Sequence, residues 1–145
     1  MILYGFFLFI FCLQTYLLTG KRWFLLGGLA SFAVLAADML ENVQLLGITA
    51  LLAEGNFDGH LRLLHLFTWL KWGGIVAVFL ILLPFFIREG RFGKVISGIV
   101  FSSLALSAAA FFHPGIANEL FSLSVMAMFL MTITFCFTYT RQETP

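Results

Sequence analysis

The chain has 145 residues, of which 61% are hydrophobic and 10% are charged, and its formal net charge is +1. Soluble domains are typically ~45–50% apolar and ~25% charged, so this composition excludes an ordinary soluble fold. The near-neutral charge and the lack of basic stripes exclude a nucleic-acid partner. The composition therefore predicts an all-α integral membrane protein whose main partner is the lipid bilayer.

Five segments are apolar enough for membrane-spanning helices, each of which needs ~20 residues. They cover residues 2–19, 23–52, 61–87, 95–112 and 116–139. We expect them to form one compact membrane domain over residues 1–145. The tripeptide His113-Pro114-Gly115 separates the last two segments, because proline and glycine together interrupt a helix strongly. A kink at this tripeptide inside one long helix, which would give four spans, is the alternative.

Positive charges are distributed unequally between the two sides that five spans define. One side receives six basic residues, namely Lys21, Arg22, Arg88, Arg91, Lys94 and Arg141. The other side receives Arg62 alone, together with the acidic residues Glu54, Asp58 and Glu119. Short cytoplasmic loops are enriched in lysine and arginine. The chain is therefore predicted to have its N-terminus outside and its C-terminus in the cytoplasm.

The second and third segments carry polar and charged side chains within their apolar runs. Asp38, Glu41 and Asn42 are spaced so that they share one helix face. His65 and Lys71 share a polar sector of the next segment. In an antiparallel hairpin, Glu41 and Lys71 lie at nearly one level, and Asp38 lies one helical turn away. This arrangement predicts an ion pair or a proton relay.

An unpaired ionised acid is costly in such a setting. An aspartate costs ~2.5–3.5 kcal/mol at the centre of a span, and pairing with Lys71 or protonation would remove much of this cost. Two registers remain open. Either the polar residues lie inside the bilayer, or the second span ends at Asn42, the third begins at Trp72, and residues 43–70 project outward as a helical hairpin. Both registers keep Glu41 opposite Lys71.

The fourth segment is rich in small residues. Gly98 and Ser102 form one small-xxx-small pair, and Ser103 and Ser107 form another. Such pairs allow two helices to approach closely. They predict helix packing within the chain or self-association, and a protein partner would contact this segment and the outer hairpin.

The sequence lacks the patterns of common catalytic and cofactor sites. It contains no P-loop, Rossmann, GxSxG or HExxH pattern. Its histidines also lack the spacing of a metal-ligand motif. We therefore assign no catalytic residue, no metal ligand and no cofactor.

The D-x-x-E-N pattern of Asp38, Glu41 and Asn42, with the L-K-W of Leu70 to Trp72 in the next segment, resembles a group of proteins. These are small, uncharacterised bacterial multi-pass membrane proteins. The resemblance covers this hairpin alone. It implies a bacterial cytoplasmic membrane and no particular activity.

Three functions are compatible with this pattern. A non-enzymatic accessory or assembly subunit, which we favour, would use the ion pair to fix how its helices pack. A proton- or ion-linked permease or channel subunit would move ions through Asp38, Glu41 and Lys71, with His65 as a relay. A membrane enzyme acting on lipid or quinone would need a nucleophile or metal set that the sequence does not provide.

Overall fold

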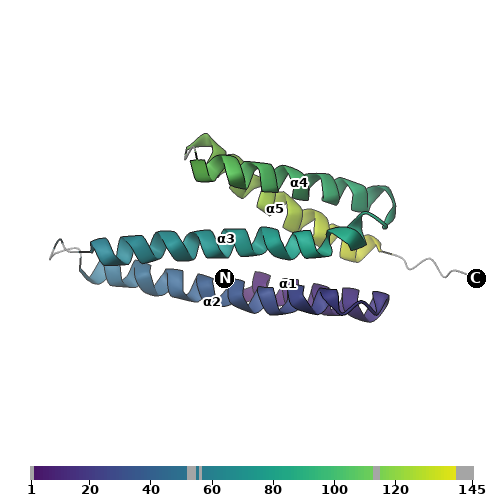
Figure 1. Cartoon of the computed structure of the whole chain (residues 1–145), viewed down its shortest axis with the longest axis horizontal. Coiled ribbons are helices and arrows are strands. Elements are labelled where there is room, and N and C mark those ends of the chain that lie inside the picture. The colour runs from purple at the N-terminus through teal and green to yellow at the C-terminus, as the bar shows by residue number, and fades with distance from the viewer. Residues whose placement is uncertain (1, 52–54, 56, 113–114, 140–145) are drawn as a thin grey trace, which may run out of the picture. The chain divides into compact units, whose positions relative to one another are not determined.

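The computed structural model describes residues 2–51, 55, 57–112 and 115–139. This part of the chain forms five α-helices (Figure 1). They are α1 (Ile2–Thr19), α2 (Trp23–Ala50), α3 (Asp58–Phe86), α4 (Gly90–Phe112) and α5 (Ile116–Thr138). The all-helical prediction is confirmed for these residues. Some residues used in the predictions above lie outside the described part, namely Leu52, Glu54, His113, Pro114 and Arg141.

Four of the helices, α2 to α5, are long and apolar enough to cross a membrane, with 23 to 29 residues each. The first helix, α1, is also apolar but has 18 residues. At a rise of ~1.5 Å per residue, α1 is about 27 Å long and α2 is about 42 Å long. Because a bilayer core is ~30 Å thick, α2 and α3 exceed what a single upright crossing requires. The described residues are therefore those of a helical membrane protein, and they contain four candidate spans.

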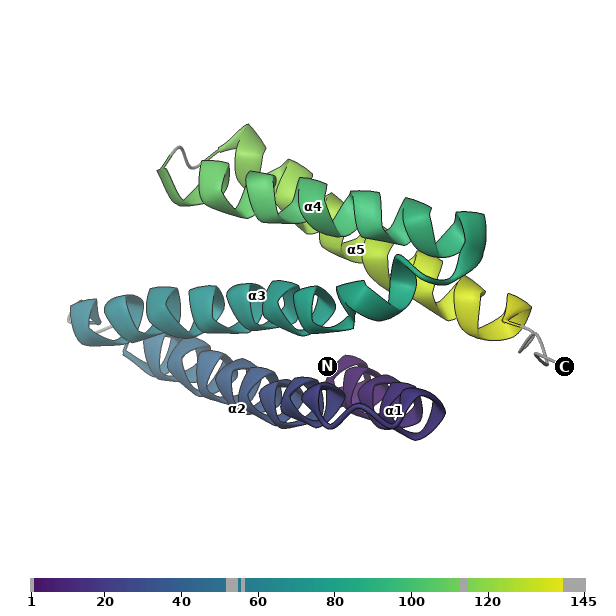
Figure 2. The same ribbon diagram turned by 45° about the vertical axis from the view of Figure 1, so that its right-hand side comes forward.

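The chain divides into two compact units, Met1–Leu82 and Leu83–Pro145. In the first unit, α1 lies beside α2, and α2 lies beside α3 (Figures 1 and 2). A Cβ atom at Gly5 would meet the Leu35 side chain at 2.6 Å, and one at Gly27 would meet the Cys12 sulfur at 2.8 Å. From the first contact to the second, the residue number rises in α1 and falls in α2, so the two helices are antiparallel. The start of α1 is therefore level with the middle of α2, near Asp38.

The α2–α3 pair is fixed at the end remote from its connecting turn. The Trp23 indole N–H donates a hydrogen bond of 2.9 Å to the Ile81 carbonyl. A Cβ atom at Gly74 would meet the Val34 side chain at 2.5 Å, so these helices also touch near their middle. Elsewhere α2 and α3 are held farther apart than α1 and α2. This wider spacing leaves room for polar side chains and for a groove.

In the second unit, α4 and α5 form an antiparallel pair that is bridged by a hydrogen bond of 2.9 Å between Ser103 and Ser124. The chain therefore reverses between Phe112 and Ile116, and the alternative of one long kinked helix is wrong. The helix α4 begins at Gly90, earlier than the predicted residue 95. The reason is local: Gly90 adopts a positive φ of 47°, which reverses the chain so that the polar residues after it are already helical.

Candidate functional site

The helices α2 and α3 bring three ionisable side chains into one buried cluster. Lys71 Nζ lies 3.3 Å from Asp38 Oδ1. It also forms a hydrogen-bonded ion pair with Glu41 Oε2. Asp38 is 2% exposed and Lys71 is 8% exposed. The Glu41–Lys71 contact expected from the sequence is present, and Asp38 shares the same ammonium.

Neighbouring polar side chains surround this cluster. The Thr68 hydroxyl donates a hydrogen bond of 2.8 Å to Glu41 Oε1, so both oxygens of that carboxylate are engaged. The Tyr4 side chain of α1 interacts electrostatically with Asp38 and Glu41. Asn42 Nδ2 donates a hydrogen bond of 2.7 Å to the Asp38 backbone carbonyl. Three helices therefore contribute to the cluster, and Asn42 supports the backbone beneath it.

The cluster contains more negative than positive formal charge. With both acids ionised, Asp38 and Glu41 contribute two negative charges against the single ammonium of Lys71. Isolated charge is costly in a low-dielectric interior, and hydrogen-bond donors or a bound proton lower that cost. The Trp72 ring centroid lies 5.5 Å from Lys71 Nζ, within the range of a cation–π contact. The Lys71 ammonium is therefore held between two carboxylates and an aromatic ring.

A second polar pair lies closer to the turn of the hairpin. His60 Nδ1 and Gln44 Oε1 are 2.7 Å apart, and because the amide oxygen only accepts, His60 donates from Nδ1. A Cβ atom at Gly47 would lie 2.7 Å from the His60 ring, so the absence of a side chain there makes room for the imidazole. This pair is not among the contacts predicted from the sequence. The signal was present, because Gln44 and Gly47 continue the three-residue spacing of Asp38 and Glu41.

His65 is not part of the cluster. Its side chain is exposed. The His65 ring packs edge-on against Trp69, with ring centroids 6.2 Å apart. The predicted role of His65 as a relay from the acids therefore has no supporting contact among the described residues.

The small residues of α4 divide between two environments. Ser103 is buried and bonds to Ser124 of α5. Gly98 and Ser102 are exposed, and the Ser102 hydroxyl donates to the Gly98 carbonyl of its own helix. Ser107 is half-buried. Of the predicted packing residues, only Ser103 makes a side-chain hydrogen bond between helices in the described structure.

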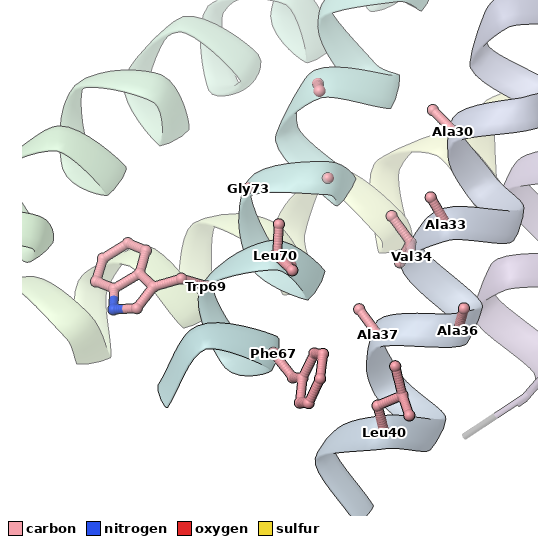
Figure 3. Close-up of a pocket in the computed structure, with 12 residues that line it drawn as sticks. Ala30, Ala33, Val34, Ala36, Ala37, Leu40, Phe67, Trp69, Leu70 and Gly73 are labelled. Atoms are coloured by element: carbon pink, nitrogen blue, oxygen red, sulfur yellow. The ribbon is translucent and has the colours of Figure 1, made fainter. Parts of the chain in front are cut away.

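A groove of about 520 Å³ lies between α2 and α3 (Figure 3). Alanines predominate on its α2 side, whereas its α3 side combines large apolar residues with two adjacent glycines. The lining residues are Ala30, Ala33, Val34, Ala36, Ala37, Leu40, Phe67, Trp69, Leu70, Gly73, Gly74 and Ala77. None of these side chains is charged, so the groove itself offers no acid–base group.

The described residues contain no group of three or more histidine, cysteine, aspartate or glutamate side chains that could hold a metal ion. The two buried acids are instead paired with Lys71. The cluster is therefore an ion-pair site built from the chain's own groups.

No protein-family model matches this chain, and no curated protein or solved structure is significantly similar to it. Its function must be inferred from the charge cluster and from the surfaces around it.

Proposed function

We propose that this protein is a non-enzymatic accessory or assembly subunit of a complex in the bacterial cytoplasmic membrane. The charge cluster would fix the register of α2 against α3 and so present their outer ends to a partner. The carrying observation is that Lys71 is shared by Asp38 and Glu41 while Thr68 occupies the remaining oxygen of Glu41. The Lys71 ammonium is therefore paired with carboxylates of its own chain.

A cluster of this kind specifies one alignment of two helices. Apolar helix faces built from leucine and alanine pack almost equally well after a shift of one turn. A buried charge, in contrast, is strongly destabilising when its partner is removed. Sliding α3 by one turn would move Lys71 away from one of the two acids and leave that carboxylate unpaired. Specificity of register is the best-attested use of buried polar groups.

Helix lengths support a projecting hairpin. From Trp23 to Asp38 the rise is about 22 Å, and from Trp23 to Glu41 it is about 27 Å. If Trp23 marks the inner boundary of a ~30 Å core, the cluster lies just inside the outer boundary. The start of α1 reaches the same level. We therefore propose five spans with the N-terminus outside, and an α2–α3 tip that extends beyond the bilayer.

The projecting tip exposes apolar side chains that suit a protein contact. Leu46 of α2 is 71% exposed, and Leu61 of α3 is 42% exposed. Outside the hydrocarbon core, lipid tails would not cover them. A partner subunit that packs on this tip would bury them, and this is the contact through which we propose assembly.

Native mass spectrometry after purification in mild detergent tests this proposal. We expect the wild-type chain in a complex of defined stoichiometry, and we expect Leu46→Asn to release it. The matched control is Thr49→Asn, which alters an exposed residue of the same helix without removing an apolar side chain. Circular dichroism checks that both variants remain helical. A wild-type chain that is monomeric in its native membrane would overturn the assembly role.

A second candidate is a proton-linked permease or channel subunit, because the cluster holds two carboxylates for one ammonium. The test is proton flux into vesicles that contain the purified protein and a pH-sensitive dye. The accessory role predicts no flux above that of empty vesicles. Flux that is present in the wild type and lost in Glu41→Gln, with the protein still inserted, would assign transport instead.

A further inference from the structure

The groove between α2 and α3 has the form of a site for a hydrocarbon chain. Its α2 wall extends from Ala30 to Leu40, which is about 15 Å along the helix. Its volume of about 520 Å³ lies within the ~300–1,000 Å³ of typical ligand sites. Figure 3 shows small side chains such as Ala33 and Ala37 facing a space that the larger Phe67 and Leu70 border. An elongated apolar space between two membrane helices suits a lipid tail.

Two charged side chains of α3 lie farther toward the hairpin turn than the groove does. Arg62 precedes Trp69 by seven residues and Gly73 by eleven, so all three share one face of α3. Arg62 is about 10 Å along the helix from Trp69, and Asp58 is about 6 Å farther. Both charged residues are exposed. Among the described residues, the ion pairs are those of Lys71, and neither Arg62 nor Asp58 belongs to them.

The depth of these residues matches that of lipid headgroups. His60 pairs with Gln44, which lies about 32 Å along α2 from Trp23, and Arg62 lies about 3 Å closer to Trp23 than His60 does. Arg62 is therefore about 28 Å above Trp23, at the edge of the ~30 Å core, where its long side chain can reach the phosphate groups. Trp69 is about 10 Å below Arg62, level with the part of the groove that an acyl chain would fill.

We propose that this groove binds a zwitterionic phospholipid of the phosphatidylethanolamine class. One acyl chain would occupy the groove, the phosphate would accept hydrogen bonds from the Arg62 guanidinium, and the ammonium would pair with Asp58. The order along α3 is apolar groove, cation, anion, and the lipid has the complementary order of tail, phosphate, ammonium. Arginine is the side chain best suited to such a phosphate contact. The site does not depend on the assembly role.

Tryptophan quenching by brominated acyl chains tests this site in the full-length protein. Vesicles of phosphatidylcholine would contain equal mole fractions of brominated phosphatidylethanolamine, phosphatidylglycerol or phosphatidylcholine. The contribution of Trp69 to the fluorescence is the difference between the signal of the wild type and that of Trp69→Phe. We expect brominated phosphatidylethanolamine to occupy the groove with a preference of about threefold, as two solvent-facing ion pairs would provide.

Two variants separate the tail contact from the headgroup contact. Gly73→Leu should fill the groove and reduce Trp69 quenching by every lipid to the bulk level, whereas Gly98→Leu, at an open position of α4, should not. Arg62→Gln should abolish the preference and leave the protein folded, because Arg62 is exposed. The matched control is Arg91→Gln, at an exposed arginine of α4.

Several outcomes would overturn the proposal. Equal quenching by the three lipids would show no headgroup recognition, and an unchanged preference in Arg62→Gln would remove the phosphate contact. A preference for phosphatidylglycerol would exclude pairing of an ammonium with Asp58. Protection of Trp69 that increases with the protein-to-lipid ratio would assign the groove to a second copy of the chain.

Discussion

The Lys71 ammonium lies 3.3 Å from the Asp38 carboxylate across the α2–α3 interface, and it is ion-paired with Glu41 at the same time. One cation therefore serves two acids that lie one helical turn apart. The energies of the two contacts are coupled, since removing the shared lysine affects both acids together. The contribution of this cluster to stability has to be measured by changing its members in combination.

Replacing Lys71 with methionine should destabilise the fold strongly. The change leaves two buried carboxylates without a cation, and breaking a buried pair in this way costs ~3–5 kcal/mol. The triple variant Asp38→Asn, Glu41→Gln, Lys71→Met should recover much of that loss, because it removes the uncompensated charges. Unfolding in mixed micelles, followed by circular dichroism, measures both. Equal losses in the single and triple variants would contradict the electrostatic account.

Two adjacent glycines of α3 should respond differently to alanine. At Gly74 the new Cβ would lie 2.5 Å from the Val34 side chain, so the two helices must separate or Val34 must move. Overpacking of this kind typically costs ~1–3 kcal/mol. At Gly73 nothing lies within 4 Å of the new Cβ. Gly73→Ala should therefore be neutral or slightly stabilising in the same unfolding experiment, and similar losses at both positions would contradict the observed helix spacing.

The close approach of Gly47 to His60 predicts a further difference. Gly47→Ala would place a methyl group 2.7 Å from the His60 ring and displace it from Gln44. The loss of this part-buried hydrogen bond should cost about 1 kcal/mol. Gly59→Ala, where nothing lies within 4 Å, is the control. The His60 ring resonances, measured by NMR, should shift in the first variant alone.

The serines of α4 provide a comparison in the second unit. Ser103→Ala removes the hydrogen bond to Ser124, and interhelical bonds in membrane proteins contribute ~0.6 kcal/mol on average. Ser102→Ala removes a bond of 3.0 Å to the Gly98 carbonyl of the same helix, which leaves the α4–α5 contact intact. We expect a small loss of thermal stability in the first variant and none in the second. A larger loss for Ser102→Ala would indicate that this exposed serine contacts another chain.

The α2–α3 hairpin was predictable because charges in apolar helices are rare and their spacing is regular. Counting residues from the turn was enough to bring Glu41 and Lys71 to one level. The pairing of Gln44 with His60 was not found. Histidine and glutamine near the end of a helix are also common in loops, so their presence did not indicate a contact. Only the position of Gly47 indicates that there is space for a side chain between the helices.

The start of α4 and the groove show where sequence patterns give less information. The polar residues around Gly90 read as a loop, whereas the positive φ of this glycine turns the chain directly into a helix. The groove depends on small residues from two helices facing one another. Ala33 and Gly73 are visible in the sequence as small residues, but their sharing of one space depends on the rotation of α2 against α3.

The contacts of α3 with α2 recur at intervals along a rigid rod, from His60 through Thr68 and Lys71 to Gly74. Inserting a single residue within that rod would rotate everything beyond it by about 100° and advance it by about 1.5 Å. His60 could then no longer face Gln44 while Lys71 still faced Asp38. Insertions and deletions should therefore be absent from this part of α3 in related proteins that still function. Substitutions, which preserve the spacing of the contacts, can accumulate.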